Sequence, residues 1–194
     1  IDAGANTDST PSMLRQFAAM GAVYAREILG VAEPSIGLLS IGGEETKGNE
    51  TTKEALALLR KSPLRVHGNV EGHDLFEGRV HVVVCDGFVG NVVLKTSESV
   101  AHFIGEWLRA EFTRNPLRLL GAALLKPALN AIRRASDPAA YGGAPLLGVN
   151  GVCIIGHGVS NAFAVLNAIR YALQAVHHRL NPLIVEAIAR VERA

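Results

Sequence analysis

The chain has 194 residues, of which 48% are hydrophobic and 19% charged, and its 19 Lys and Arg and 18 Asp and Glu give a formal net charge of +1. A chain of this length and composition folds around a substantial core and is not expected to be disordered. With six Phe, three Tyr and one Trp, it lacks the basic, aromatic-rich surface of nucleic-acid-binding proteins, so no nucleic-acid partner is predicted.

The two cysteines and seven histidines indicate no metal centre. Cys85 and Cys153 each stand inside an apolar run, where a thiol usually packs as a small hydrophobe. No Cys-x-x-Cys pair is present, and the histidines show no ligand spacing. We therefore predict no metal, no cofactor and no disulfide. Because no secretory segment is recognisable, the expected location is the cytoplasm.

The first forty residues predict a strand end, a helix and a strand. Ile1-Asp2-Ala3-Gly4 resembles a strand running into a glycine turn, which suggests that the chain begins partway through a longer protein. Thr10-Pro11 is a capping residue followed by Pro at the first helical position, and apolar residues then recur at helical spacing up to Gly30. The short apolar run 35–41 is typical of a buried strand.

The rest of the chain continues the alternation of strands and helices. Helices are predicted at about 50–61, at about 91–113 and from Asn161 onward, and strands at 64–70, 80–85, 146–149 and 152–155. This order predicts an α/β, Rossmann-like layered fold with a mainly parallel sheet and ligands at the carboxyl ends of the strands. We expect a single α/β catalytic domain over 1–194, with a helical dimerisation and membrane-contact segment at about 105–136.

Two predicted strand-to-helix turns have the composition of anion sites, because glycines there free backbone N–H groups at a helix start. In the first turn, 42–50, Lys47 adds a positive charge beside Gly48 and Asn49, but the spacing is not that of a Walker A motif. A flexible surface loop is the alternative there. In the second turn, 86–96, Asn91 and Lys95 lie four residues apart and so share a helix face. Its alternative is that Asp86 only caps the helix and that Lys95 is solvated.

The third turn, 156–161, holds a histidine between two glycines, Gly156-His157-Gly158, followed by Ser160 and Asn161. A lone histidine is more often structural than catalytic. Here it stands between an apolar strand and a helix, where backbone freedom serves no packing purpose, which favours a functional role.

Residues 112–136 form a basic, apolar segment with five basic residues and no acidic one. Pro116, Gly121 and Pro127 interrupt it, so we predict a protruding helical hairpin whose apolar tip enters a lipid headgroup region. A helix pair buried in a dimer interface is the alternative, and the two are compatible. The residues expected at the membrane are Arg118, Leu119, Leu120, Leu124, Leu125 and Lys126, and neutralising Arg114, Arg118, Arg133 and Arg134 is expected to release the chain from anionic vesicles.

Several ordered blocks across essentially the whole chain resemble the bacterial phosphate acyltransferase family. They are Asp2-Ala-Gly-Ala-Asn6-Thr-Asp8, Gln16-Phe-Ala-Ala-Met-Gly21, Lys47-Gly-Asn-Glu50, Gly68-Asn-Val-Glu-Gly72, Cys85-Asp-Gly-Phe-Val-Gly-Asn-Val-Val-Leu-Lys-Thr96, Tyr141-Gly-Gly-Ala-Pro-Leu-Leu-Gly148 and Gly156-His-Gly158. Family members are longer, so the chain corresponds to their C-terminal majority. The family is also remotely similar to phosphotransacetylases.

The resemblance implies an acyltransferase that converts acyl-acyl carrier protein and inorganic phosphate to acyl phosphate, at the start of phospholipid synthesis. Phosphate would attack the thioester directly, with no covalent enzyme intermediate. It also implies a homodimer, a peripheral membrane position on the inner face of the cell membrane, and a functional link to a membrane glycerol-3-phosphate acyltransferase.

On this mechanism the turns take the following expected roles. Catalytic roles fall to Lys95, Asn91, Asp86 and His157, the last as a possible proton donor to the thiolate. Substrate or phosphate binding falls to Lys47, Gly48, Asn49, Gly90, Gly158, Ser160 and Asn161. A phosphotransacetylase acting on acyl-CoA and an inactive truncated scaffold are the alternatives, while a nicotinamide-dependent dehydrogenase is disfavoured because no GxGxxG turn follows a strand.

Overall fold

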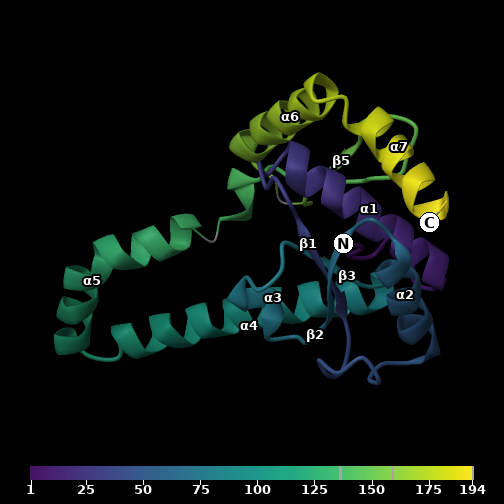
Figure 1. Ribbon diagram of the computed structural model, residues 1–194. Coiled ribbons are helices and arrows are strands. Elements are labelled where there is room, and N and C mark those ends of the chain that lie inside the picture. The colour runs from purple at the N-terminus through teal and green to yellow at the C-terminus, as the bar shows by residue number, and fades with distance from the viewer. Residues whose placement is uncertain (136, 159, 194) are drawn as a thin grey trace.

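The computed structural model describes residues 1–135, 137–158 and 160–193, and the side chains of 133–135 and 138 are outside that description. The chain forms an α/β body from which two helices project as a long arm (Figure 1). The helices are α1 (Pro11–Glu27), α2 (Glu50–Lys61), α3 (Asp74–Glu77), α4 (Gly87–Thr113), α5 (Pro116–Ala135), η1 (Pro138–Ala140), α6 (Ala162–His177) and α7 (Leu180–Arg193). The strands are β1 (Ser35–Leu39), β2 (Arg65–Val70), β3 (Val82–Val84), β4 (Ala144–Pro145) and β5 (Ile154–Ile155).

The body is built on a three-stranded parallel sheet in the order β2-β1-β3. This confirms the predicted Rossmann-like α/β class. Beyond β3, the ammonium group of Ile1 donates to the carbonyl of Val83 at 2.6 Å, and the N–H of Cys85 donates to the carbonyl of Ile1 at 3.0 Å. These two bonds continue the parallel pattern, so the first residue lies beside β3 as the expected strand end.

The main core lies between the sheet and the helices α1, α2 and α7. β1 is buried almost throughout because strands covered on both faces are continuously apolar. Ile36 and Leu38 of β1 are fully buried against Leu14 of α1 and Leu59 of α2. Each such side chain contributes about 1.5–3 kcal/mol by leaving water, which fixes α1 and α2 on the sheet.

Four helices begin at the capping residues that the sequence offers. The side chains of Thr10, Asn49, Asp86 and Asn161 each accept a backbone N–H from the first turn of α1, α2, α4 and α6. Capping of this kind satisfies N–H groups that have no partner within the helix. The predicted α1 and α2 are therefore confirmed.

Other predicted boundaries are wrong. α4 starts at Gly87, four residues before the expected position, because Asp86 caps it. The late strands are the antiparallel pair β4 and β5, displaced from the predicted 146–149 and shortened from 152–155. The final helix divides into α6 and α7, since Arg179 between them has a φ of 52°, which a helix cannot contain.

The predicted hairpin within 112–136 is also placed differently. α5 runs without interruption from Pro116 to Ala135 and includes Pro127. The chain turns at Arg114 and Asn115, and α5 itself bends along its course, so that α4 and α5 together form the arm (Figure 1). No helix among the described residues is long and apolar enough to cross a membrane.

Candidate functional site

The largest hollow described lies at the carboxyl ends of β1 and β3, where α1, α2 and α4 all begin. Strand order reverses between these two strands, which is where α/β sheets usually bind ligands. The hollow has a volume of about 790 Å³. We call it the cradle, and its lining is Thr7, Asp8, Ser9, Thr10, Pro11, Leu14, Leu38, Leu39, Ser40, Ile41, Gly48, Asn49, Thr51, Thr52, Cys85, Asp86 and Val89.

Three helix N-termini point their positive ends toward the cradle, and Asp8 and Asp86 are the charged side chains in its lining. The first turn of a helix carries unpaired N–H groups and about half a positive charge, so it favours anions. Hydroxyl groups surround these helix starts, and the Oγ of Ser40 is buried without a hydrogen-bond partner among the described residues. The cradle thus offers backbone and hydroxyl donors to a small anion.

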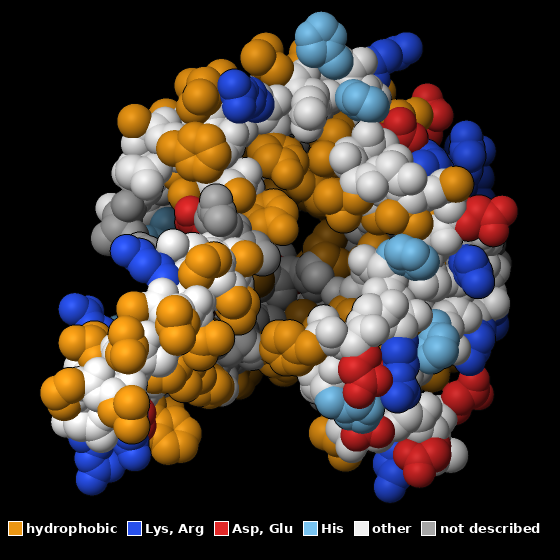
Figure 2. Space-filling view, turned by 90° about the vertical axis from the view of Figure 1, so that its left-hand side faces the viewer, with side chains coloured by type: hydrophobic (Ala, Val, Ile, Leu, Met, Phe, Trp, Pro, Cys, Tyr) orange, Lys and Arg blue, Asp and Glu red, His pale blue; other side chains and the backbone are white. Residues whose placement is uncertain are grey.

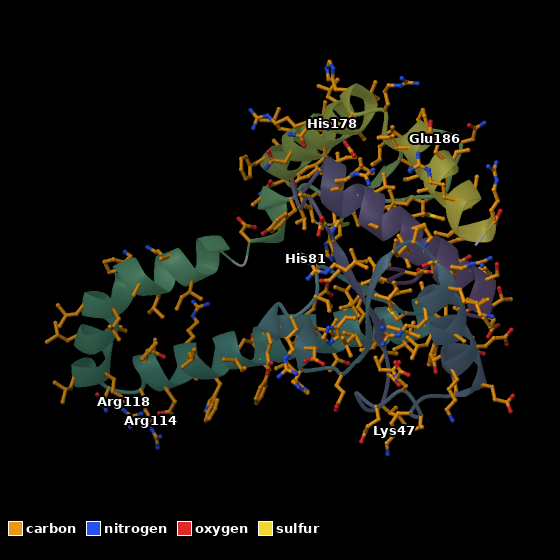
Figure 3. All side chains as sticks on the ribbon, in the orientation of Figure 1. Lys47, His81, Arg114, Arg118, His178 and Glu186 are labelled. Carbon is orange, nitrogen blue, oxygen red and sulfur yellow. The ribbon has the colours of Figure 1, made fainter. Side chains whose placement is uncertain are left out.

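The first predicted turn reaches the cradle through Gly48 and Asn49. The amide of Asn69 on β2 holds this turn by donating to the carbonyls of Glu44 at 2.8 Å and Lys47 at 3.4 Å. Lys47 itself is exposed at the outer edge of the loop and does not line the cradle (Figure 3). The structure therefore brings the backbone of this turn to the cradle but not the charged side chain of Lys47.

The second predicted turn contributes Asp86 and Val89. The carboxylate of Asp86 accepts the N–H of Val89 at 2.7 Å. Because α4 starts early, Lys95 lies nine residues beyond the cap, about 13 Å along the helix, and pairs with Glu98 at 3.0 Å. Asn91 therefore lies about one turn into α4, and Lys95 lies one turn further along the helix.

Two other residues of that turn pack against the N-terminal loop. Gly87 and Gly90 are buried, and a Cβ on Gly87 would lie 2.8 Å from the carbonyl of Asn6. Asn91 is exposed, and its side chain faces the backbone at Gly4. Close helix–loop packing is what requires glycine at these positions.

The third predicted turn does not reach the cradle. Gly156, His157 and Ser160 line a separate hollow of about 410 Å³ beside α6. Ile154, just before this turn, lies with Tyr24 and Ile28 near the C-terminal end of α1. Pro11, at the other end of α1, lines the cradle, and a helix of this length spans about 25 Å. His157, Gly158, Ser160 and Asn161 are therefore separated from the other predicted site residues within one chain.

Residues 2–10 also belong to the site, although the sequence patterns above do not assign them to it. They form a fourth strand-to-helix turn, between the strand end at Ile1 and α1, and supply Thr7, Asp8, Ser9 and Thr10 to the cradle. The available signal was Ile1-Asp2-Ala3-Gly4, a strand end followed by glycine, and the capping pair Thr10-Pro11.

Titratable groups at the edge of the cradle are shifted by their surroundings. Burial raises the pKa of the Cys85 thiol, which donates to the carbonyls of Ile1 and Asp2. Burial alone would also raise the pKa of Asp2, but hydrogen bonds from Asn6, Ala5 and Gly4 outweigh it and lower that pKa. Cys85 is thus a neutral thiol near neutral pH, and Asp2 is a carboxylate.

The arm exposes apolar side chains. Figure 2 shows hydrophobic side chains gathered on a projecting lobe with basic ones at its edges. Arg114 and Arg118, labelled in Figure 3, both pair with Glu111, so part of the basic charge is compensated. The side chains of Arg133 and Arg134 lie outside the described residues. Exposed apolar residues of the arm include Phe103, Trp107, Leu117, Leu119, Leu120, Leu124, Leu125 and Ile132.

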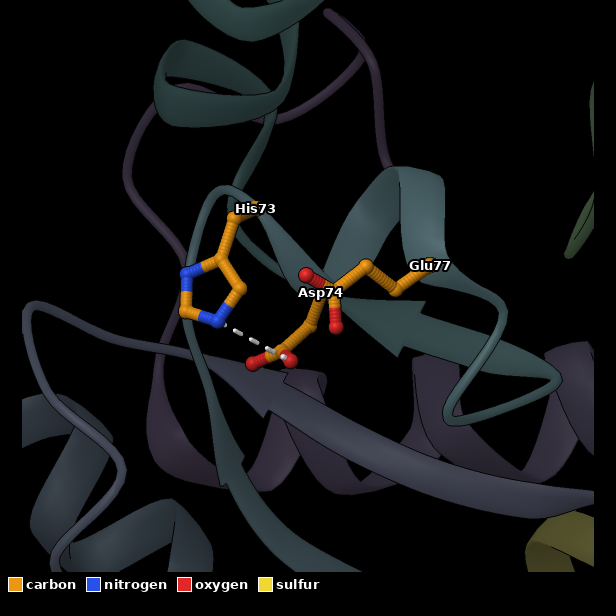
Figure 4. Close-up of side chains that lie close together, drawn as sticks. All are labelled: His73, Asp74 and Glu77. Atoms are coloured by element: carbon orange, nitrogen blue, oxygen red, sulfur yellow. Dashed lines mark ion pairs between the residues drawn. The ribbon is translucent and has the colours of Figure 1, made fainter.

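One cluster in the described part of the chain has metal-ligand spacing. His73, Asp74 and Glu77 bring ligand atoms within 4.8 Å of one another (Figure 4). Arg79 lies against both carboxylates, at 3.1 Å from Asp74 and 2.8 Å from Glu77. Because the Arg79 guanidinium already pairs with both carboxylates, we assign the cluster to an ion-pair network and not to a metal.

The fold and the cradle define an α/β protein with a hollow at a topological switch point whose lining offers hydrogen-bond donors to a small anion. The chain matches the family described as fatty acid synthesis protein over residues 1–182, and it belongs to that family. Proteins named phosphate acyltransferase from Desulfitobacterium hafniense, Halothermothrix orenii and Pelotomaculum thermopropionicum are 53%, 50% and 50% identical to it. The matches cover 91%, 97% and 99% of this chain but 53%, 57% and 56% of those relatives. The resemblance seen in the sequence is confirmed, and the chain spans about half the length of the curated relatives it matches.

Proposed function

We propose that the chain carries the phosphate-binding part of an acyltransferase that makes acyl phosphate from acyl-acyl carrier protein and inorganic phosphate. The observation that supports this proposal is the convergence of three helix starts on one hollow at the ends of β1 and β3. A phosphate dianion is the reactant that such a site suits. The acyl-transfer part of the proposal rests on the family and on the names of the relatives.

The proposed reaction needs positioning more than it needs an enzyme nucleophile. A phosphate oxygen forms a bond to the thioester carbonyl carbon, and the carbon–sulfur bond then breaks. The carrier's phosphopantetheine thiolate leaves and takes up a proton. Holding phosphate beside the thioester raises the rate because it removes the entropy cost of bringing two reactants together.

The predicted site residues take different parts in this proposal. Backbone N–H groups of Gly48 and Asn49 and the first turn of α4 after Asp86 bind phosphate. Lys47 and Lys95, which do not line the cradle, serve the phosphopantetheine arm or the acidic carrier. Asn91 and Gly90 hold the N-terminal loop beside α4.

The third turn has a more distant proposed role. His157, Gly158, Ser160 and Asn161 lie at the other end of α1 from the cradle. A part in the same reaction therefore requires a second copy of the chain. We propose a homodimer that pairs through the arm, whose exposed apolar residues would otherwise face water.

The arm also supports the proposed peripheral contact with the inner face of the cell membrane. Leu119, Leu124 and Leu125 are more than half exposed, and burial of each in a headgroup region is worth about 1.5–3 kcal/mol. Arg118 is paired with Glu111, which leaves the leucines as the main source of binding energy. The acyl phosphate would then form near a membrane glycerol-3-phosphate acyltransferase.

The experiment is incubation of the purified chain with palmitoyl-acyl carrier protein and labelled phosphate, followed by detection of labelled acyl phosphate. Asn49→Ala removes the cap that orders the first turn of α2, so a loss of product in this variant supports the proposal. A parallel Lys95→Ala variant shows whether the outer face of α4 takes part. Product formed from palmitoyl-CoA but not from the carrier would favour a phosphotransacetylase. No product from either donor contradicts the proposal that this chain carries the activity.

A further inference from the structure

Asp2 has a backbone conformation that residues other than glycine rarely adopt. It has a φ of 31° and is 9% exposed. Residues other than glycine adopt this region only where their surroundings determine it, and such positions cluster at functional sites. Asp2 begins the loop that ends at the Thr10 cap of α1.

The carboxylate of Asp2 organises this loop. One oxygen accepts the N–H groups of Gly4 at 3.1 Å and Ala5 at 2.8 Å. The other accepts the N–H of Asn6 at 3.0 Å and its side-chain amide at 2.9 Å. A charged acceptor with four donors is a strong, directional anchor, so the path of residues 3–6 is set by one side chain.

α4 fixes the same loop from the opposite side. The N–H of Gly87 donates to the carbonyl of Asn6 at 2.7 Å. A Cβ on Gly87 would lie 2.9 Å from a carboxylate oxygen of Asp2, and one on Gly90 would overlap the Asp2 carbonyl. The loop is therefore held between its own carboxylate and the first turn of α4.

We propose that Asp2 is a positioning residue for phosphate binding, an inference that rests on the proposed function. Asp2 does not line the cradle and would not touch the ligand. Its four hydrogen bonds place the following residues, Thr7 to Thr10, along the wall of the cradle, which Gly48 and Asn49 also line. Donors placed before the anion arrives bind it without a further ordering cost.

The test compares Asp2→Asn with Glu33→Gln, which removes the same charge from an exposed residue outside the site. Hydrogen exchange at the amides of Gly4, Ala5 and Asn6 reports the anchor, and calorimetric titration with inorganic phosphate reports the positioning. In Asp2→Asn we expect faster exchange at these three amides, unchanged exchange in the core of α1, and phosphate affinity about tenfold weaker. Glu33→Gln is expected to match the wild type in both measurements.

Asn6→Ala provides a milder second variant, because it removes one of the four bonds and leaves the carboxylate in place. Its expected phosphate affinity lies between those of the wild type and Asp2→Asn. Unchanged exchange at the three amides in both variants would overturn the anchor, and faster exchange with unchanged phosphate affinity would overturn the positioning role. Failure of the wild type to bind phosphate would instead overturn the proposed function, and the exchange data would still decide the anchor.

Discussion

Gly90 on α4 lies so close to the backbone carbonyl of Asp2 that a Cβ at position 90 would overlap the carbonyl oxygen. We predict that Gly90→Ala lowers the free energy of unfolding by about 1–3 kcal/mol, the usual cost of overpacking. Gly105 lies in the same helix with nothing within 4 Å of an added Cβ, so Gly105→Ala is expected to stabilise by about 0.5–1 kcal/mol. Urea denaturation measures the free energy of unfolding of both variants. Equal changes in the two variants would contradict the close packing at Gly90.

Two substitutions at Asp86 distinguish the contribution of its capping hydrogen bond from that of its charge. Its carboxylate accepts the N–H of Val89, and loss of an N-cap costs about 1 kcal/mol. We predict that Asp86→Ala loses this amount in chemical denaturation and that Asp86→Asn retains most of it, because Asn caps equally well. If both variants lose the same stability, charge rather than capping governs the start of α4.

Leu124 on α5 is 77% exposed and belongs to the proposed membrane surface. Leu124→Glu is predicted to reduce binding to phosphatidylglycerol vesicles about tenfold, because it removes an apolar side chain and adds a repelled charge. Leu29, 56% exposed outside the arm, is the matched control, and Leu29→Glu should bind as the wild type does. Sedimentation with vesicles measures both, and equal binding by all three proteins would rule out contact through the arm.

Asp2 gives a pH dependence whose sign follows from its lowered pKa. A carboxyl group with a lower pKa in the folded state stabilises the fold above its unfolded pKa, and this contribution is lost as pH falls through the folded pKa. The wild type should therefore be more stable than Asp2→Asn at neutral pH, with a difference that shrinks below about pH 4. Denaturation curves of both proteins at pH 7 and pH 3 test this, and a constant difference would contradict the assigned hydrogen bonds.

Local capping chemistry made much of the fold predictable. Thr10-Pro11 and Asn49 define the starts of α1 and α2, because a capping side chain and an amphipathic repeat act within a few residues. The short strands β4 and β5 were misplaced, since two-residue pairing depends on contacts that no local pattern encodes. The early start of α4 does not follow from the sequence, because Gly87 and Gly90 are typical of a turn. In the structure these glycines allow α4 to pack closely against Asp2 and Asn6.

The candidate site was predictable in part. Two glycine turns after strands do meet at one edge of the sheet, as parallel topology requires, and they bring Gly48, Asn49 and Asp86 to the cradle. The turn at His157 has a similar glycine-rich sequence, but it follows the antiparallel β5 instead of a strand of the main sheet. It therefore lies away from the cradle. Which strands share a sheet is a tertiary property that turn composition alone does not reveal.

Phosphate binding in the cradle can be measured by titrating the isotope-labelled chain with inorganic phosphate and following the backbone amides by NMR. We predict saturable shifts at Thr10, Asn49 and Val89, which are caps or first-turn residues of the three helices that meet there. Shifts centred on His157 and Ser160, or shifts that do not saturate, would contradict it.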